Sequence, residues 1–272
     1  MLTQDVMTTL WPAALRAAPG LIEGIISAAP AVFAANDMAD AVPIAHAMAQ
    51  FSHECLGGAM LVEDLDYSAE GLVKTWPSRF NAARAATFAR NPERIANAVY
   101  NGRLGNRPDS DDGWIFRGRG GAQTTGRASY QRLGARTGLN LSDHPDLVND
   151  PAHFLACAVG QFVLCGCLPF ALRDDLGGVT YHLNGGFIGL ADRQVWLNRW
   201  KDALCAAAAG PGTLWLQQRL NLWGQEPPLM MDGAFGPITQ GALRSFQINQ
   251  GLVADGYLSA ATIAALEQTP PS

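Results

Sequence analysis

The chain has 272 residues, of which 48% are hydrophobic and 16% are charged, and its formal net charge is −5. This length and balance suit one or two folded domains and exclude a largely disordered protein. The negative charge excludes an overall basic field that would attract nucleic acid or anionic lipid. We expect no nucleic-acid partner and a monomeric protein.

Helical patterns dominate the sequence in chain order. Residues 40–56 are the strongest case, because helical spacing is kept by Val42, Ala45, Ala49 and Ser52, with Met48 and Phe51. The glycine-dense stretch 102–126 is expected to be a loop with a short hairpin. The expected helical segments are 3–35 (one or two helices), 40–56, 61–76, 78–90, 93–101, 129–137, 151–168 and 190–208. The sequence therefore predicts a mainly α-helical fold.

The N-terminal segment lacks the basic region of a secretory signal, since no basic residue precedes Arg16. We therefore expect synthesis in the cytoplasm without a signal peptide. Within residues 3–35, Pro12 and Pro30 are expected near helix boundaries.

The run 154–172 contains no charged residue and reaches the length of a membrane span. Gln161, two glycines and Pro169 interrupt it, and a span here would separate the motifs on either side. A buried central helix is the better interpretation, with no membrane span.

Metal and disulfide chemistry find little support in the sequence. The cysteines are odd in number and have no paired spacing, which favours buried, reduced thiols. They are Cys55, Cys157, Cys165, Cys167 and Cys205. His53 and Glu54 begin a zinc-protease pattern, but position 57 is glycine where that pattern needs histidine. We expect no metal and no cofactor.

A domain boundary is expected at the glycine-proline-glycine sequence 210–212. The expected domains are 1–208 and 209–272, joined by a linker at about 206–212.

The second domain contains a repeat. Asp232 precedes Thr239 by seven residues, Asp255 precedes Thr262 by the same interval, and a leucine follows each threonine by four. Each copy is expected to be a turn that leads into a helix with threonine available as N-cap. Over about 212–268 the sequence resembles the three-helix peptidoglycan-binding domain of many wall hydrolases.

Two glutamates carry the strongest functional signal. Glu54 lies near the end of the predicted helix 40–56, and Glu63 follows the break at Gly57 and Gly58. Glycosidic bonds are hydrolysed by two carboxylates that act on opposite sides of the sugar. A helix-borne glutamate and a second one on the following loop fit this chemistry.

Further motifs accompany the glutamates in a fixed order. HE(x)8E is followed by FRGRGxxQxTGRxxY at 116–130, by NGG at 184–186 and by ADR at 191–193. Together, over about 5–202, they resemble glycoside hydrolase family 19, which includes plant-type chitinases and phage lysins. The short interval between the glutamates is more similar to the phage-lysin branch. The resemblance implies a two-lobed, lysozyme-like domain that inverts configuration.

The resemblance assigns the two acids. Glu54 is expected to be the general acid, in an apolar setting to which Phe51 and Leu56 could contribute. Glu63 is expected to be the general base that holds a water. Inversion requires the carboxyl groups to be about 6.5–9.5 Å apart. Nearby acids that compete for the base role are Asp64, Asp66 and Glu70.

The resemblance also implies roles for six further residues. Thr125 is expected to help hold the attacking water, with a helix N-cap as the alternative. Gln123 matches a sugar-contacting amide, and Tyr130 is included among the substrate-binding candidates.

Arg119 is also a substrate-binding candidate, although we expect it to brace the cleft loop rather than to contact substrate. Asn184 matches a substrate-binding amide, or it serves only the turn. Arg193 matches an arginine that pairs with the acids.

The leading hypothesis is an endolysin-type muramidase that cleaves β-1,4 bonds of peptidoglycan and acts on the cell wall after release or delivery. One alternative is a chitinase with the same machinery. Others are an injected antibacterial effector and an inactive wall-binding protein. The predicted second domain favours peptidoglycan as the partner.

Overall fold

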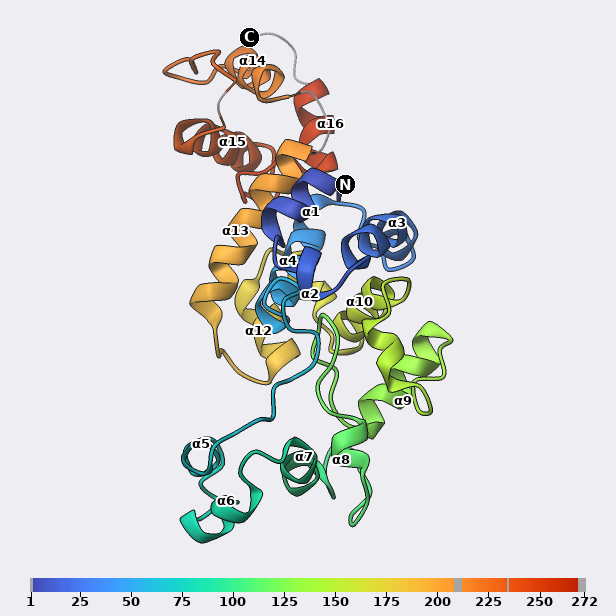
Figure 1. Cartoon of the computed structure of the whole chain (residues 1–272). Coiled ribbons are helices and arrows are strands. Elements are labelled where there is room, and N and C mark those ends of the chain that lie inside the picture. Colours follow the sequence, from blue (N-terminus) through green and yellow to red (C-terminus); the bar gives the residue numbers. More distant parts are fainter. Residues whose placement is uncertain (1, 208–211, 234, 269–272) are drawn as a thin grey trace. The chain divides into compact units, whose positions relative to one another are not determined.

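A computed structural model describes residues 2–207, 212–233 and 235–268 (Figure 1). In these ranges the regular elements are helices, which confirms the mainly α-helical prediction. Residues 145–149 form a 3₁₀-helix, η1. The α-helices are α1 (Gln4–Leu10), α2 (Ala14–Ala17), α3 (Leu21–Ala34), α4 (Ala41–Glu54), α5 (Ala69–Thr75), α6 (Ala82–Phe88), α7 (Pro92–Tyr100), α8 (Asp112–Ile115), α9 (Arg127–Thr137), α10 (Phe154–Leu164), α11 (Leu168–Ala171), α12 (Leu176–Asn184), α13 (Leu190–Ala207), α14 (Thr213–Trp223), α15 (Pro237–Asn249) and α16 (Ala260–Gln268).

The chain folds into two compact units, each assembled from separate stretches of sequence. One comprises residues 1–12, 29–53 and 165–272, and the other comprises residues 13–28 and 54–164. The expected linker falls largely on residues 208–211, which lie outside the described residues. A separate C-terminal domain therefore stays a prediction.

Several helix predictions need correction. Residues 3–35 form three helices, α1, α2 and α3, where one or two were predicted. Residues 61–68 are not helical, because Val62 forms an antiparallel bridge with Arg119 and α5 begins only after its N-cap Ser68. Pro30 lies inside α3 and not at a boundary.

Helix α12 was not predicted, because Gly177 and Gly178 favour a loop by composition. A β-carbon at Gly178 would lie 2.1 Å from the Phe170 ring, so close packing requires glycine there. The Asp175 side chain caps this helix by accepting a hydrogen bond from the Gly178 N–H at 2.8 Å.

Helix α4 is anchored in the core of the first unit by Ser52. The indole N–H groups of Trp11 and Trp200 each donate to Ser52 Oγ at 2.8 Å, and Ser52 Oγ donates to the Met48 carbonyl at 2.7 Å. All these side chains are buried. The last turn of α4, which ends at Glu54, is therefore fixed by polar contacts inside an apolar core.

The second unit contains two apolar clusters. One joins α5, α6 and α7 through Leu65, Leu72, Phe80, Ala85, Ile95, Ala96 and Val99. The other lies around α9, η1 and α10 and consists of Phe116, Tyr130, Leu133, Leu141, Val148 and Cys157. Burial of these side chains holds the loop 112–126 on a framework of helices.

The C-terminal helices α14, α15 and α16 share an apolar cluster that includes Leu216, Leu243 and Leu266. The predicted sequence repeat is visible as a structural one. Gln217 Nε2 donates to Asp232 Oδ1 at 2.7 Å and to Thr239 Oγ1 at 3.4 Å.

The second copy repeats this arrangement with Gln247. Its Nε2 donates to Asp255 Oδ1 at 2.8 Å and to Thr262 Oγ1 at 3.3 Å. The predicted threonine N-caps are therefore wrong: Gly236 is the N-cap of α15, and Ser259 accepts the Thr262 N–H at 3.1 Å. Each threonine instead accepts from a buried glutamine.

Cys55, Cys157 and Cys167 are buried free thiols, as predicted, and Cys165 is a free thiol of intermediate burial. Burial raises the pKa of the Cys55 thiol to about 12. The side chain of Cys205 is outside the described structure.

The uncharged run beginning at 154 forms the buried helix α10 and then the short α11. Among the described residues, no helix combines the length and the apolar character that crossing a membrane requires.

Candidate active site

The chain reverses sharply after Glu54, the last residue of α4. Leu56, Gly57 and Gly58 all have positive φ angles (49°, 59° and 79°), and the Met60 N–H donates to the Cys55 carbonyl at 3.0 Å. Two consecutive glycines accept this left-handed backbone at little cost. Leu56 is 58% exposed, so it does not supply the apolar setting expected for Glu54.

After this reversal, backbone hydrogen bonds pair residues 61–63 with residues 118–120. The Glu63 N–H donates to the Gly118 carbonyl at 3.0 Å, and the Gly120 N–H donates to the Leu61 carbonyl at 2.9 Å. Arg119 and Thr124 then exchange backbone hydrogen bonds of 3.2 and 2.8 Å across a tight turn. This turn is the short hairpin expected within 102–126.

The Glu63 carboxylate receives one donor on each oxygen. The Gly118 N–H donates to Oε1 at 2.6 Å, and the Tyr100 hydroxyl donates to Oε2 at 2.8 Å. A carboxylate has about four acceptor positions, so each oxygen keeps one for a further donor such as water. Sequence reasoning missed Tyr100, since a contact across 37 residues leaves no local pattern.

Gln123 and Thr125 converge on the same place as Glu63. A β-carbon on Gly118 would lie 2.8 Å from Gln123 Oε1, 3.2 Å from Thr125 Oγ1 and 3.4 Å from Glu63 Cδ. The Thr125 hydroxyl donates to the Gln123 carbonyl at 2.9 Å. The alternative role for Thr125 is wrong, because the N-cap of α9 is Gly126.

The acids that competed with Glu63 lie in other interactions. Asp66 pairs with Arg90 at 2.9 Å, and Asp64 Oδ1 accepts the Asp66 N–H at 2.8 Å. Glu70 is exposed in the first turn of α5. Of these four acids, Glu63 is the one whose side chain hydrogen-bonds the 118–125 loop in the described structure.

Arg119 and Tyr130 brace this loop from its buried side. Arg119 Nε donates to Asp146 Oδ1 and NH1 donates to the Ile115 carbonyl, both at 2.7 Å. The Tyr130 hydroxyl accepts from Arg119 NH1 at 3.2 Å and donates to the Arg117 carbonyl at 2.9 Å. Both side chains are almost wholly buried, which is unsuited to the substrate contact expected of them.

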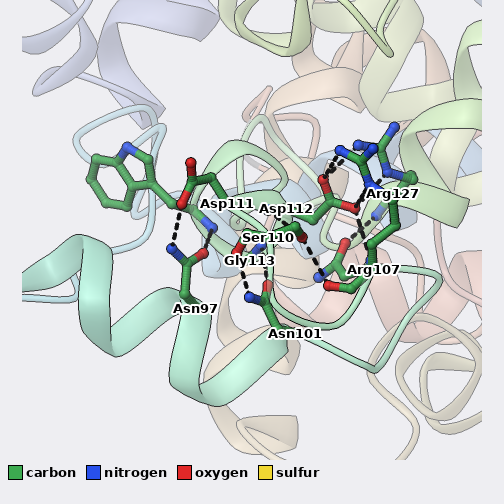
Figure 2. Close-up of polar contacts among 10 residues, drawn as sticks. Asn97, Asn101, Arg107, Ser110, Asp111, Asp112, Gly113 and Arg127 are labelled. Carbon is green, nitrogen blue, oxygen red and sulfur yellow. Dashed lines mark hydrogen bonds and ion pairs between the residues drawn. The ribbon is translucent and has the colours of Figure 1, made fainter.

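Asp112 joins the segments that flank the loop (Figure 2). Its two carboxylate oxygens accept from Arg127 Nε and NH2 at 2.7 and 2.5 Å. Arg107 adds Nε and NH2 contacts of 3.2 and 3.0 Å. Hydrogen bonds from Arg127, followed by those from Arg107, hold the pKa of Asp112 well below its usual value.

Helix α7 fixes the start of α8 in the same network. Figure 2 shows Asn97 and Asn101 directed toward the segment 110–113. Asn97 Oδ1 accepts the Trp114 N–H and Asn101 Oδ1 accepts the Gly113 N–H, both at 2.8 Å. Two asparagine side chains thereby serve the N–H groups that a helix start leaves without intrahelical partners.

The remaining candidates, Asn184 and Arg193, belong to the first unit. Asn184 is exposed at the end of α12, before Gly185 with its φ of 72°. Arg193 is 1% exposed; its Nε donates to the Ile188 carbonyl at 3.2 Å and its NH1 donates to Gln50 Oε1. Gln50 lies one turn before Glu54 on α4, and sequence reasoning missed it.

In the described ranges no group of three or more histidine, cysteine or acidic side chains is arranged to hold a metal ion. In the second unit, the Glu63 carboxylate with its two hydrogen-bond donors lies near the Gln123 amide and the Thr125 hydroxyl. Glu54, the last residue of α4, precedes this carboxylate in the sequence. Hydrolysis of a glycosidic bond by paired carboxylates would need groups of these kinds.

Comparison with known proteins identifies the family. The chain is 33% identical over 178 residues to a glycosyl hydrolase family 19 domain-containing protein of Haemophilus influenzae. The aligned region covers 64% of this chain and 86% of that protein. The chain belongs to glycosyl hydrolase family 19 and is a glycoside hydrolase. A family model for a peptidoglycan binding domain matches residues 209–266.

Two solved chitinase structures are also similar over part of the chain. Chitinase C from Streptomyces griseus has 17% identity and a TM-score of 0.47, over 75% of this chain and 92% of that one. A mutant of chitinase C has 16% identity and a TM-score of 0.47, over 75% and 76% of the two chains.

Proposed function

We propose that the protein is a muramidase that hydrolyses β-1,4 glycosidic bonds of peptidoglycan with inversion of configuration. The observation that carries the chemistry is the Glu63 carboxylate, which has one donor on each oxygen and faces Gln123 and Thr125. The choice of polymer is supported by the peptidoglycan-binding match at 209–266.

In this mechanism Glu54 donates its proton to the leaving glycosidic oxygen. Glu63 accepts a proton from a water molecule, whose oxygen attacks the anomeric carbon from the opposite face of the sugar. The bond to the leaving oxygen breaks, and the product carries the inverted configuration. Glu54 then regains a proton from solvent, and Glu63 loses one.

The other candidates act around these two steps. Thr125 hydrogen-bonds the same water as Glu63, and Gln123 contacts the sugar. Asn184 is a further substrate-binding amide, and Arg193 supports the charge of the acids. Arg119 and Tyr130 hold the loop from behind, in keeping with their burial.

The C-terminal helices retain the enzyme on the wall in this proposal. A second binding site on the same polymer raises the local concentration of substrate without adding a catalytic contact. Removing residues 209–272 is therefore expected to weaken binding to sacculi much more than turnover of short, soluble muropeptide chains.

Product analysis tests the choice of bond and polymer. Purified sacculi and chitin oligomers are digested in parallel, and the products are reduced and analysed by mass spectrometry. Reduced muramic acid ends support the muramidase. Hydrolysis of chitin alone supports the chitinase alternative, and binding to sacculi without products supports an inactive wall-binding protein.

Glu54→Gln and Glu63→Gln test the two carboxylates. Each variant removes a protonation step but keeps the side-chain size, so we expect activity to fall by at least about a hundredfold. Circular dichroism checks that both remain folded, and Glu70→Gln is the matched control on an exposed glutamate. A folded variant at position 54 or 63 with near-normal activity would remove that residue from the mechanism.

A further inference from the structure

We propose that Tyr100 is the positioning residue of the catalytic base: its hydroxyl orients the Glu63 carboxylate. This inference depends on the proposed role of Glu63. Tyr100 is the last residue of α7, and its hydroxyl donates to Glu63 Oε2 at 2.8 Å.

Two donors from different elements determine how the carboxylate is turned. The Gly118 N–H approaches Oε1 from the 118–125 loop, while the Tyr100 hydroxyl approaches Oε2 from α7. With both oxygens held, rotation about the terminal bond of the glutamate would break at least one contact. The free acceptor positions then keep a fixed direction, which a base needs in order to align its water.

Tyr100 is itself tied to the segment that carries Thr125. Its carbonyl accepts from Asn106 Nδ2 at 3.1 Å, and Asn106 Oδ1 accepts the Arg127 N–H at 2.8 Å. Arg127 opens α9 two residues after Thr125 and is held by Asp112. The donor to the base and the proposed water-binding hydroxyl therefore share one polar framework.

The Tyr100 hydroxyl stays protonated at neutral pH. Burial, followed by the charge of Glu63, raises the pKa of Tyr100 far above its usual value. Tyr100 is thus a permanent donor in this contact. The ring also packs against the apolar cluster of α5 to α7, so removal of the oxygen alone leaves the packing in place.

The charge of Glu63 also contributes to the pKa shifts of Tyr67 and Arg117. Tyr67 lies on the same segment as Asp64, and Arg117 lies in the loop before Gly118. The Tyr67 ring packs on Trp76 with centroids 5.0 Å apart, and its hydroxyl has no hydrogen bond to Glu63 in the described structure. Tyr67→Phe is therefore a matched control near the same carboxylate.

The test compares wild type, Tyr100→Phe and Tyr67→Phe by the release of reducing ends from soluble muropeptide chains, measured as kcat and KM. A carboxylate that is free to turn no longer aligns its water, while substrate binding is left in place. In Tyr100→Phe, we expect kcat to fall at least about tenfold with KM nearly unchanged. Tyr67→Phe is expected to keep the wild-type kcat and KM.

Uniform replacement of tyrosine by 3-fluorotyrosine supplies a second measurement without truncation. Fluorination changes the strength of the phenol as a hydrogen-bond donor without removing it, so kcat should change in wild type but not in Tyr100→Phe. The difference isolates Tyr100 from the other tyrosines. Thermal unfolding of each preparation checks that the fold is retained.

The outcomes separate the inference from the proposed function. If Glu63→Gln is inactive and Tyr100→Phe keeps the wild-type kcat, Tyr100 does not position the base. If Glu63→Gln keeps its activity, the proposed role of Glu63 itself is wrong. An unfolded Tyr100→Phe together with a kcat that fluorotyrosine leaves unchanged would also overturn the inference.

Discussion

Glu63 and Gly118 are joined by two hydrogen bonds of opposite direction. The Glu63 backbone N–H donates to the Gly118 carbonyl at 3.0 Å, and the Gly118 N–H donates to Glu63 Oε1 at 2.6 Å. The first hydrogen bond fixes the position of the Glu63 backbone, and the second fixes the position of its carboxylate. The glycine that makes both contacts also leaves room for Gln123 and Thr125.

Gly118→Ala should therefore damage activity more than stability. The new β-carbon would lie 2.8 Å from Gln123 Oε1 and 3.2 Å from Thr125 Oγ1, so these two side chains must shift. A displacement of about 1 Å at a reacting group can cost about a hundredfold in rate. Lysis rates of sacculi, measured beside thermal unfolding, test this expectation. Gly241→Ala, with open space around the added carbon, is the control.

Ser52→Ala should destabilise the first unit. The substitution removes the acceptor shared by the buried Trp11 and Trp200 indoles. Loss of partners for two buried donors costs on the order of 2–4 kcal/mol in the free energy of unfolding. Denaturant unfolding followed by tryptophan fluorescence measures the change. A loss below about 0.5 kcal/mol would show that these contacts contribute little.

Asp112→Asn should lower stability at neutral pH and matter less in acid. The folded-state pKa of Asp112 is depressed, chiefly by hydrogen bonds from Arg127, so ionised Asp112 favours the folded state. This contribution is complete above the unfolded-state pKa of about 3.9 and is lost progressively as the pH falls from there toward the depressed folded-state pKa. The free energies of unfolding of wild type and variant, measured by denaturant unfolding, should therefore differ by a constant amount above about pH 4 and begin to converge only below it.

Exposed Asp109 supplies the control for that comparison. Its positive φ of 49° suits asparagine as well as aspartate, so Asp109→Asn should follow the wild-type curve. A constant difference between wild type and Asp112→Asn at all pH values would contradict the linkage.

Gln247→Ala should disrupt the C-terminal helices while leaving the chemistry intact. The side chain is 1% exposed, donates to Asp255 and Thr262, and accepts the Gly256 N–H at 2.7 Å. We expect retention on sacculi to fall at least about tenfold, with turnover of soluble muropeptide chains nearly unchanged. Gln250→Ala, on an exposed glutamine, should behave as wild type.

Features that depend on near neighbours in the chain could be predicted from the residues alone. The apolar stripe of 40–56 predicted α4, and the glycines at 57 and 58 predicted the break after Glu54, because both effects act between near neighbours. The Asp–Thr spacing also revealed the C-terminal repeat. Glu63 could be preferred over Asp64, Asp66 and Glu70 only through family resemblance.

Contacts between residues far apart in the chain could be seen only in the folded protein. Tyr100 meets Glu63 across 37 residues, and Gln50 meets Arg193 across 143, so neither contact leaves a periodic trace in the sequence. The same reason explains the errors at 61–68 and at the two threonines. There, pairing with a distant strand-like segment or a buried glutamine prevailed over local helix and cap preferences.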